Sequence, residues 1–201
     1  PKPSAAASDV YKRQKKHWEI KGSTQECVTT TVTDGKRVFI SGGWPKNHTM
    51  AVEADGSGEV AWQNTARVYV PSMLVKNNHL YATMDAGFAV CWDSATGKER
   101  WRTARSGTMH ENPQLKKSSG TPIIRTIKDR PVLLSPGSNW LYAYDPSNGK
   151  ELWKVEYGGL GFSLVPRPVT GHGMIFMSTG FMRAKLLAVR YENTAKPDIA
   201  W

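Results

Sequence analysis

Cysteine is scarce in this 201-residue chain, which has only Cys27 and Cys91. Two distant cysteines define no disulfide framework, and no Cys-x-x-Cys or Cys/His spacing suggests a zinc site. We therefore predict that both thiols are core residues. Apolar runs long enough to cross a membrane are also missing. No segment sustains the 3.6-residue period of an amphipathic helix, which argues against a helical protein.

Acidic residues are outnumbered, since 17 Asp and Glu face 27 Lys and Arg and leave a formal net charge of +10. Residues 1–16 alone carry +4, and the remaining positive charge is dispersed over turns. Dispersed charge is typical of solvated surfaces, so nucleic-acid binding is not expected. Small residues at 5–8 follow no apolar stretch, so no signal peptide is recognised.

One phrase occurs twice with identical spacing. Residues 91–101 read CWDSATGKERW, and residues 143–153 read AYDPSNGKELW. Apolar residues precede each aspartate, and Glu-x-Trp follows each Gly-Lys, which predicts a strand, a tight turn and a second strand. The repetition indicates a protein built from repeats.

The chemistry of the turn explains the spacing. Asp93 and Asp145 are expected to accept backbone amides in Asx-turns. Gly97 and Gly149 are expected to adopt the positive φ needed where the chain enters the second strand. The lysine and glutamate that follow each glycine are expected to face solvent.

Tryptophans at the end of each phrase act as anchors, and the series comprises Trp18, Trp62, Trp101, Trp153 and Trp201. Their separations of 44, 39, 52 and 48 residues are typical of four-stranded propeller blades. Each ring is expected to wedge against the next repeat and bury about 150–250 Å². At about 25 cal/mol per Å² this contributes up to roughly 4–6 kcal/mol per anchor.

The sequence between the anchors consists of short β-rich runs, at residues 37–40, 79–83, 131–134 and 174–178. The predicted fold is therefore an all-β propeller of four-stranded antiparallel blades. It comprises about four blades, plus a remnant of one at Trp18, in an incomplete ring. We expect residues 17–201 to form this partial propeller.

The copies differ in places where loops are expected. In the first repeat Ala54 stands where the turn aspartate belongs, and Asp55 comes one place late. Insertions are predicted at residues 107–119 and 191–197. Insertions between blade strands project from the faces of a propeller, where function usually resides.

The pattern Ala-x-Asp-x-x-(Thr or Asn)-Gly-Lys-x-x-Trp resembles the tryptophan-docking repeat of the PQQ-like, or quinoprotein dehydrogenase-like, β-propellers. Residues 143–153 match in full, and residues 91–101 match with Cys91 in the alanine place. The resemblance implies that the lead-in phrases at 70–75 and 165–169 are first strands lining a central channel. It also implies rings of seven or eight blades, so the chain is expected to be a fragment, and a periplasmic or cell-envelope location.

The N-terminal segment is set apart from the repeats. Residues 9–14 read DVYKRQ, which resembles a translated sequencing adapter. We interpret residues 1–16 as a disordered tail that arose as an assembly artefact; a natural basic tail is the alternative. Either way it is left out of the fold.

Candidate catalytic residues are few. An active quinoprotein needs the quinone PQQ, a calcium ion and a carboxylate base, and dehydrogenases of the family also use adjacent cysteines, which are absent here. Asp85 and Glu111 are the only loose acidic candidates, and both are expected to be surface loop residues. Glu99 and Glu151 are expected to face solvent.

Other motifs carry little chemistry. The five histidines, His17, His48, His79, His110 and His172, show no metal-ligand spacing. His79 and His172 are predicted to occupy equivalent hairpin positions. The glycine-rich residues 158–161 open no helix and are expected to pack tightly near the channel. Residues 47–49 fit a glycosylation acceptor pattern, but chance matches to it are common and a bacterial origin would deprive it of meaning.

Two functional hypotheses remain open. The first is a non-catalytic scaffold that binds protein partners through loops 107–119 and 191–197, without a cofactor, similar to the outer-membrane assembly lipoproteins. The alternative is a PQQ- and calcium-dependent alcohol or sugar dehydrogenase whose catalytic residues lie in further blades. The repeated phrase itself supports a fold and not an activity.

Overall fold

The computed structural model describes Lys15 and residues 18–20, 24–116, 118–160, 164–181, 183–192 and 196–201. Apart from Lys15, the tail predicted at residues 1–16 lies outside the described residues, so its boundary stays a prediction.

Four four-stranded antiparallel sheets follow one another along the chain, and in each sheet the strands pair in sequence order. Blade 1 contains β1 (Val32–Thr33), β2 (Arg37–Gly42), β3 (His48–Glu53) and β4 (Val60–Asn64). Blade 2 contains β5 (Leu74–Lys76), β6 (His79–Met84), β7 (Phe88–Asp93) and β8 (Glu99–Ala104). Blade 3 follows a short 3₁₀ turn, η1 (Pro113–Lys116), and contains β9 (Ile123–Ile127), β10 (Arg130–Pro136), β11 (Trp140–Tyr144) and β12 (Glu151–Glu156). Blade 4 contains β13 (Val169–Gly171), β14 (Met174–Ser178), β15 (Leu186–Arg190) and β16 (Asp198–Ile199).

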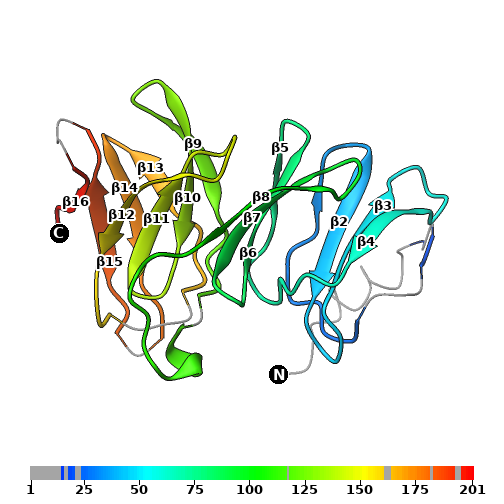
Figure 1. The fold of residues 1–201 in the computed structure, drawn as a ribbon, viewed down its shortest axis with the longest axis horizontal. Coiled ribbons are helices and arrows are strands. Elements are labelled where there is room, and N and C mark those ends of the chain that lie inside the picture. The colour runs from blue at the N-terminus through cyan, green and yellow to red at the C-terminus, as the bar shows by residue number, and fades with distance from the viewer. Residues whose placement is uncertain are drawn as a thin grey trace.

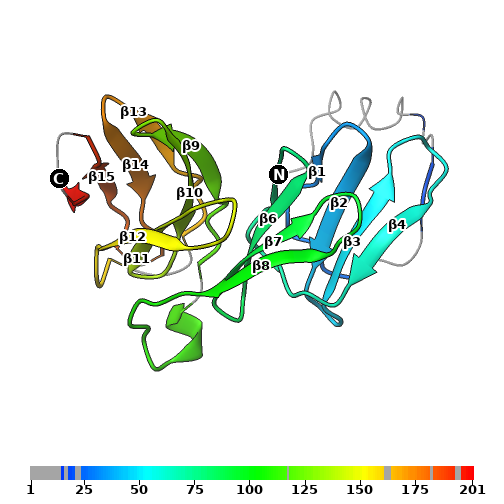
Figure 2. The same ribbon diagram turned by 45° about the horizontal axis from the view of Figure 1, so that its top comes forward.

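The blades are arranged side by side in chain order (Figure 1), with blade 1 at one end of the molecule and blade 4 at the other. The turned view keeps these two blades at opposite ends (Figure 2), so the described sheets form an open arc. The predicted all-β architecture of four-stranded propeller blades in an incomplete ring is confirmed.

The hydrophobic core lies between neighbouring blades. Phe39 of blade 1 and Leu80 of blade 2 belong to one buried cluster. Tyr81 of blade 2 and Tyr142 of blade 3 belong to a second, and a third joins blades 3 and 4. The sheets of blades 2 and 3 therefore bury both faces against neighbouring blades, which explains why their central strands read as nearly continuous apolar runs.

One register recurs around the arc. The anchor tryptophan pairs with a small residue of the third strand, as Ala51 with Trp62, Cys91 with Trp101, and Ala143 with Trp153. A β-bulge follows at each of these positions and bends the outer strand. In blade 4 the Ala188 amide donates to the Trp201 carbonyl at 2.9 Å, which extends the pattern.

The first strand of a blade is shorter than the sequence predicts. The lead-in phrase at residues 70–75 joins a strand only at Leu74, and the phrase at 165–169 does so only at Val169. Each phrase contains a proline, which lacks the amide needed for a ladder, and this limits how early pairing can begin.

Candidate functional site

The turn of the repeated phrase is organised by its aspartate. Asp93 Oδ1 accepts the amides of Ala95 at 3.1 Å and Thr96 at 3.0 Å. Its other oxygen accepts Arg100 Nη2 at 2.7 Å. The hydrogen bond from Arg100, helped by those from Thr96, lowers the pKa of Asp93 to about 2. Gly97 closes the turn with φ +70°.

The second copy repeats this device. Asp145 Oδ1 accepts the Ser147 amide at 2.8 Å, and Gly149 has φ +75°. The Ser147 hydroxyl also donates to the carboxylate, and this bond holds the pKa of Asp145 below its usual range. In blade 1, Asp55 accepts the Ser57 amide at 2.8 Å, so the displaced aspartate caps its own turn.

The tryptophan of one blade docks on the turn of the next. Trp62 of β4 is only 9% exposed, and its indole Nε1 donates to the Ser94 carbonyl at 2.9 Å. A Cβ added at Gly97 would lie 2.6 Å from the Trp62 ring. Glycine is thus required at this position both for its backbone conformation and for the close approach of the ring.

The junction between blades 2 and 3 is built the same way. Trp101 is 8% exposed and its Nε1 donates to the Pro146 carbonyl at 2.9 Å. A Cβ at Gly149 would lie 2.5 Å from the Trp101 ring. Thr103 Oγ1 adds a hydrogen bond to the Gly149 carbonyl at 2.7 Å. The residues of the repeated phrase therefore form turns and docking contacts between blades.

The N-terminal segment at residues 18–20 takes the same place on blade 1. Added Cβ atoms at Gly56 and Gly58 would lie 3.6 Å from Trp18 and 2.8 Å from Ile20, respectively. These contacts put the segment where Trp62 sits on blade 2. Trp18 itself is 38% exposed.

The junction between blades 3 and 4 departs from this pattern. Pro197 stands four residues before Trp201, where Gly97 precedes Trp101. Proline locks φ near −65° and cannot adopt the positive φ of the glycine. Trp153 is accordingly only half-buried, and a cavity of about 180 Å³ lies beside it.

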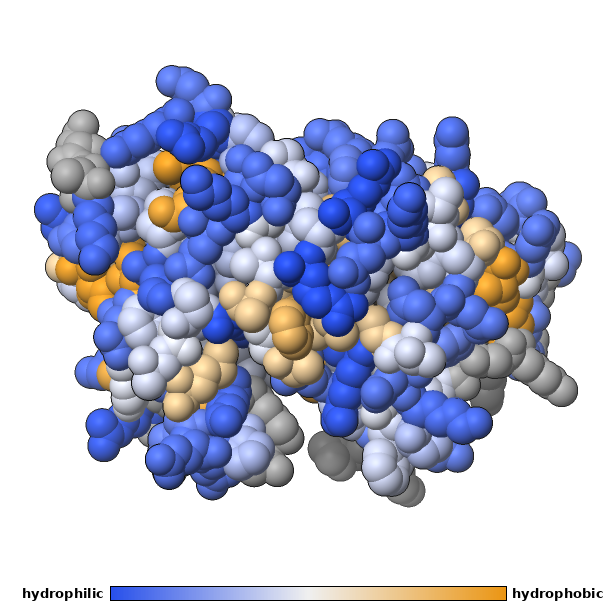
Figure 3. Space-filling view, in the orientation of Figure 1, coloured by the Kyte–Doolittle hydropathy of each residue, from blue (hydrophilic) through white to orange (hydrophobic). Residues whose placement is uncertain are grey.

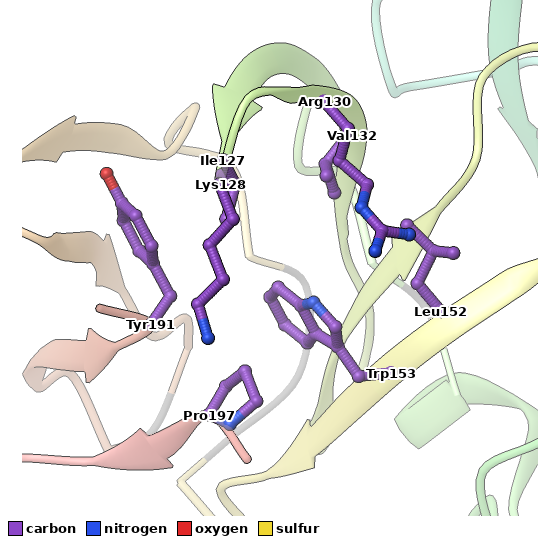
Figure 4. Close-up of a pocket in the computed structure, with 8 residues that line it drawn as sticks. All are labelled: Ile127, Lys128, Arg130, Val132, Leu152, Trp153, Tyr191 and Pro197. Carbon is purple, nitrogen blue, oxygen red and sulfur yellow. The ribbon is translucent and has the colours of Figure 1, made fainter. Parts of the chain in front are cut away.

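The cavity has aromatic walls and a cationic rim (Figure 4). It is lined by Ile127, Lys128, Arg130, Val132, Leu152, Trp153, Tyr191 and Pro197. The Lys128 side chain extends between Tyr191, Pro197 and Trp153. None of the eight lining residues is acidic.

The insertion at residues 191–197 does not project along its whole length, in contrast to the prediction. Tyr191 is 8% exposed and packs into the core cluster between blades 3 and 4. Residues 193–195 lie outside the described residues.

The loop at residues 107–119 does project beyond the ends of the strands (Figure 2). Residue 117 lies outside the described set. Trp140 Nε1 donates to the Thr108 carbonyl at 3.0 Å, and Ser138 Oγ donates to the Leu115 carbonyl at 2.6 Å. The loop is therefore held on blade 3 while its tip, including Glu111, is exposed.

A central groove of about 440 Å³ collects residues from all four blades. Its lining includes Val32 in β1, Leu74 in β5, Thr121 just before β9 and Arg167 just before β13. The first strands therefore converge, and the lead-in phrases line the groove between them. The cationic side chain in this lining is Arg167.

The buried cation Arg105 lies at the junction of blades 2 and 3. The Arg105 guanidinium lies 5.2 Å from the centroid of the Tyr142 ring, and its Nη2 donates to Ser135 Oγ at 2.9 Å and to the Pro136 carbonyl at 3.0 Å. Burial lowers the pKa of Arg105 and raises that of Tyr142. No sequence motif indicates this contact.

The loose acidic candidates are not brought into a reactive cluster. Asp85 pairs with Arg67 at 2.7 Å, and Glu111 belongs to the projecting loop. In contrast to the prediction, Glu151 does not face solvent freely, because its carboxylate accepts a hydrogen bond from the Ser106 hydroxyl. In the part of the chain that the structure describes, no three His, Cys, Asp or Glu side chains are placed to hold a metal ion.

Several smaller predictions are wrong. Cys27 is exposed, and only Cys91 is a core thiol. His172 lies in the β13–β14 turn with φ +50°, whereas His79 begins β6, so the two are not equivalent. Gly158 has open space around it instead of tight packing.

Two histidines make local contacts. His48 Nε2 lies 3.0 Å from Gln63 Oε1, and His110 Nδ1 accepts the Asn112 amide at 3.0 Å. His17 and Gly161 lie outside the described residues.

No helix among the described residues has the length and apolar character needed to span a bilayer.

Comparison with protein families gives one match. A family model described as outer membrane protein assembly factor BamB matches residues 9–103 and 45–194. These two matches cover most of the chain, including the tryptophan-docking junctions of Trp62 and Trp101. No curated protein matches the chain significantly.

Solved structures share the fold. BamB from Moraxella catarrhalis is 16% identical, with a TM-score of 0.70 over 90% of this chain and 53% of that one. A quinohemoprotein alcohol dehydrogenase from Comamonas testosteroni is 15% identical, with a TM-score of 0.64 over 89% of this chain and 35% of that one. A europium-containing methanol dehydrogenase is 20% identical, with a TM-score of 0.52 over 71% and 27%. The chain thus spans about half the length of the BamB structure.

Proposed function

Because the chain belongs to the family of outer membrane protein assembly factor BamB, we propose that it is a non-catalytic β-propeller that serves as a protein-interaction scaffold in the bacterial envelope. In this role it binds protein partners in or near the periplasm and needs no cofactor. The name of the family further suggests that the partners take part in outer-membrane protein assembly.

The projecting loop at residues 107–116 is the observation that carries the proposal. Its anchoring through Thr108 and Leu115 limits its freedom without covering its tip. A loop held in one conformation loses less entropy when it binds a partner. Loops placed on a rigid scaffold are also where binding residues concentrate.

The use of the phrase residues supports the same conclusion. Asp93 and Asp145 cap turns and the docked tryptophans fill blade junctions, so these side chains have structural roles. A function is argued from a site and not from the fold. The exposed loop is a better candidate for that site than the repeated phrase.

The experiment compares two charge reversals in the protein, with a purified outer-membrane protein assembly complex immobilised as the probe. Glu111→Arg changes the tip of the loop, whereas Lys98→Glu changes an exposed turn at the opposite end of the antiparallel strands. We expect Glu111→Arg to weaken binding about tenfold, which is about 1.4 kcal/mol, and Lys98→Glu to leave it unchanged.

A parallel titration with PQQ and calcium separates the scaffold from the dehydrogenase. The scaffold predicts no bound-quinone absorbance and no oxidation of alcohols or sugars. A quinone spectrum together with turnover, and no binding to the assembly complex, would establish the alternative instead.

A further inference from the structure

All four blades contribute side chains to the central groove of about 440 Å³. The groove is lined by Thr30, Val32, Thr33, Ser72, Met73, Leu74, Val75, Thr121 and Arg167. Apolar side chains, hydroxyl groups and a single cation thus meet in one place. We propose that this groove binds the C-terminal end of a partner polypeptide, with the terminal carboxylate at Arg167 and the last, apolar side chain on the apolar part of the lining.

Two hydrogen bonds hold together the segments that form the groove. The Thr30 amide donates to Ser72 Oγ at 2.9 Å, which joins the segments that precede β1 and β5. The Ser119 amide donates to the Leu164 carbonyl at 2.8 Å, which joins the segments that precede β9 and β13. The groove is therefore formed without a ligand, and this lowers the entropic cost of binding.

Arg167 is available to a ligand. Its side chain is exposed, and no hydrogen bond or ion pair joins it to another residue that the structure describes. Pro166 and Pro168 flank it and restrict its backbone. None of the nine lining residues is acidic, so a carboxylate meets no like charge in the lining. A guanidinium binds a carboxylate through two parallel hydrogen bonds, which makes Arg167 the anchor for the terminal charge.

The apolar part of the lining suits the last side chain of a peptide. It consists of Val32, Met73, Leu74 and Val75. Most of the face drawn in Figure 3 is hydrophilic, and its apolar patches are small. The groove is thus more apolar than that surface, and its volume falls within the range of about 300–1,000 Å³ that is typical of ligand sites.

Backbone groups favour a peptide over a small aliphatic acid. β1 and β5 are edge strands of their sheets, and Val32 and Leu74 of the groove lining belong to them. An edge strand presents N–H and C=O groups on its free side. An extended peptide can form hydrogen bonds with such groups, whereas an aliphatic chain cannot. The hydroxyl groups of Thr30 and Thr121 offer further hydrogen bonds to peptide carbonyls.

The test is fluorescence anisotropy with an N-terminally labelled peptide, Gly-Ala-Ala-Leu, that has a free C-terminus. One matched peptide carries a C-terminal amide in place of the carboxylate, and another replaces the last leucine by glycine. Each change should weaken binding about tenfold. Added salt should weaken binding of the free acid, because it screens the attraction between the carboxylate and Arg167. Equal affinity for the free acid and the amide would overturn the proposal.

Two competitors separate the possible sources of a carboxylate. Octanoate supplies an aliphatic acid, and PQQ with calcium supplies the cofactor of the dehydrogenases. Unlabelled peptide should displace the labelled peptide at lower concentrations than either competitor. Displacement by octanoate or PQQ at an equal or lower concentration would reject the peptide site.

The protein variants isolate the contact between Arg167 and the carboxylate. Arg167→Gln removes the charge of an exposed side chain, and Arg183→Gln does the same at an exposed arginine of blade 4 outside the groove lining. Arg167→Gln should weaken binding of the free acid about tenfold and leave binding of the amide unchanged, whereas Arg183→Gln should change neither. Arg167→Lys should restore part of the affinity, because it keeps the charge without the paired hydrogen bonds. An equal loss for the acid and the amide in Arg167→Gln would reject the contact.

This inference rests on the proposed scaffold function, but the two can fail separately. The residues of the loop at 107–116 do not line the groove. Binding to the assembly complex that depends on Glu111, without any peptide binding, would keep the scaffold and reject the groove. Peptide binding without binding to the complex would keep the groove and reject the scaffold.

Discussion

Trp62 and Ser94 belong to different blades, and the indole N–H of Trp62 donates to the Ser94 carbonyl at 2.9 Å. The same bond joins Trp101 to Pro146 at the next junction. Each repeat therefore stabilises its neighbour through one aromatic ring and one turn. This nearest-neighbour arrangement is how repeat proteins gain stability.

Removal of a docked ring should cost far more stability than removal of an undocked one. Trp101→Ala is expected to lower the free energy of unfolding by about 3–5 kcal/mol, because the site cannot refill the lost volume. Trp201 is 59% exposed, and Trp201→Ala should cost less than about 1 kcal/mol. Urea denaturation measures both, and equal losses would contradict the docking interpretation.

Two glycines with similar backbone angles should respond differently to alanine. Gly97 has φ +70° and faces the Trp62 ring, whereas Gly87 has φ +85° with nothing within 4 Å of an added Cβ. Gly87→Ala should cost about 1–2 kcal/mol for the left-handed backbone alone. Gly97→Ala should cost at least about 2 kcal/mol more, because the Trp62 ring must leave its groove. Thermal denaturation tests the pair, and equal costs would mean that the ring accommodates the methyl group.

Acid should weaken the fold through Asp93. The hydrogen bond from Arg100 lowers the pKa of Asp93 from 3.8 to about 2, so the folded state favours the ionised carboxylate. This stabilisation is fully present above the unfolded pKa and is lost as pH falls from about 4 toward 2. Asp93→Asn should therefore lower stability at pH 7 and flatten its dependence on pH in this window. Urea midpoints at several pH values measure the effect, with Asp129→Asn in an exposed turn as the control; parallel curves for wild type and Asp93→Asn would argue against it.

The two cysteines should differ in reactivity. Cys91 is buried, and burial raises the pKa of its thiol to about 12, whereas Cys27 is exposed. Because the thiolate is the reactive form, iodoacetamide should label Cys27 in the native protein and Cys91 only after denaturation. Mass spectrometry of the labelled peptides reads this out directly. Labelling of Cys91 in the native state would indicate that the junction between blades 2 and 3 opens readily.

The blade architecture could be predicted from the sequence because its determinants are local. Asp93 and Gly97 define a turn by their own side chain and backbone, and Trp101 follows at a fixed distance. The alternation between such turns and short apolar runs leaves few other folds.

Contacts that depend on packing between distant segments could not be predicted. Arg105 lies on Tyr142, which is far along the chain, and no motif marks that pairing. Cys27 looked like a core residue by its type alone, but it lies outside the paired strands of blade 1.

The departure at the third junction could be predicted in part from the sequence. An insertion at residues 191–197 could be read from the spacing, and Pro197 stands in the glycine place. Sequence alone did not indicate that Tyr191 turns back against blade 3 or that Lys128 reaches the same cavity. Those positions depend on how two sheets pack.

The most direct measurement is site-specific photo-cross-linking in living bacteria, with benzoylphenylalanine at position 111 in the projecting loop or at position 98 in the opposite turn. The scaffold function predicts that the probe at 111 cross-links to a component of the outer-membrane protein assembly machinery and that the probe at 98 does not. Equal cross-linking from both positions, or none from position 111, would contradict it.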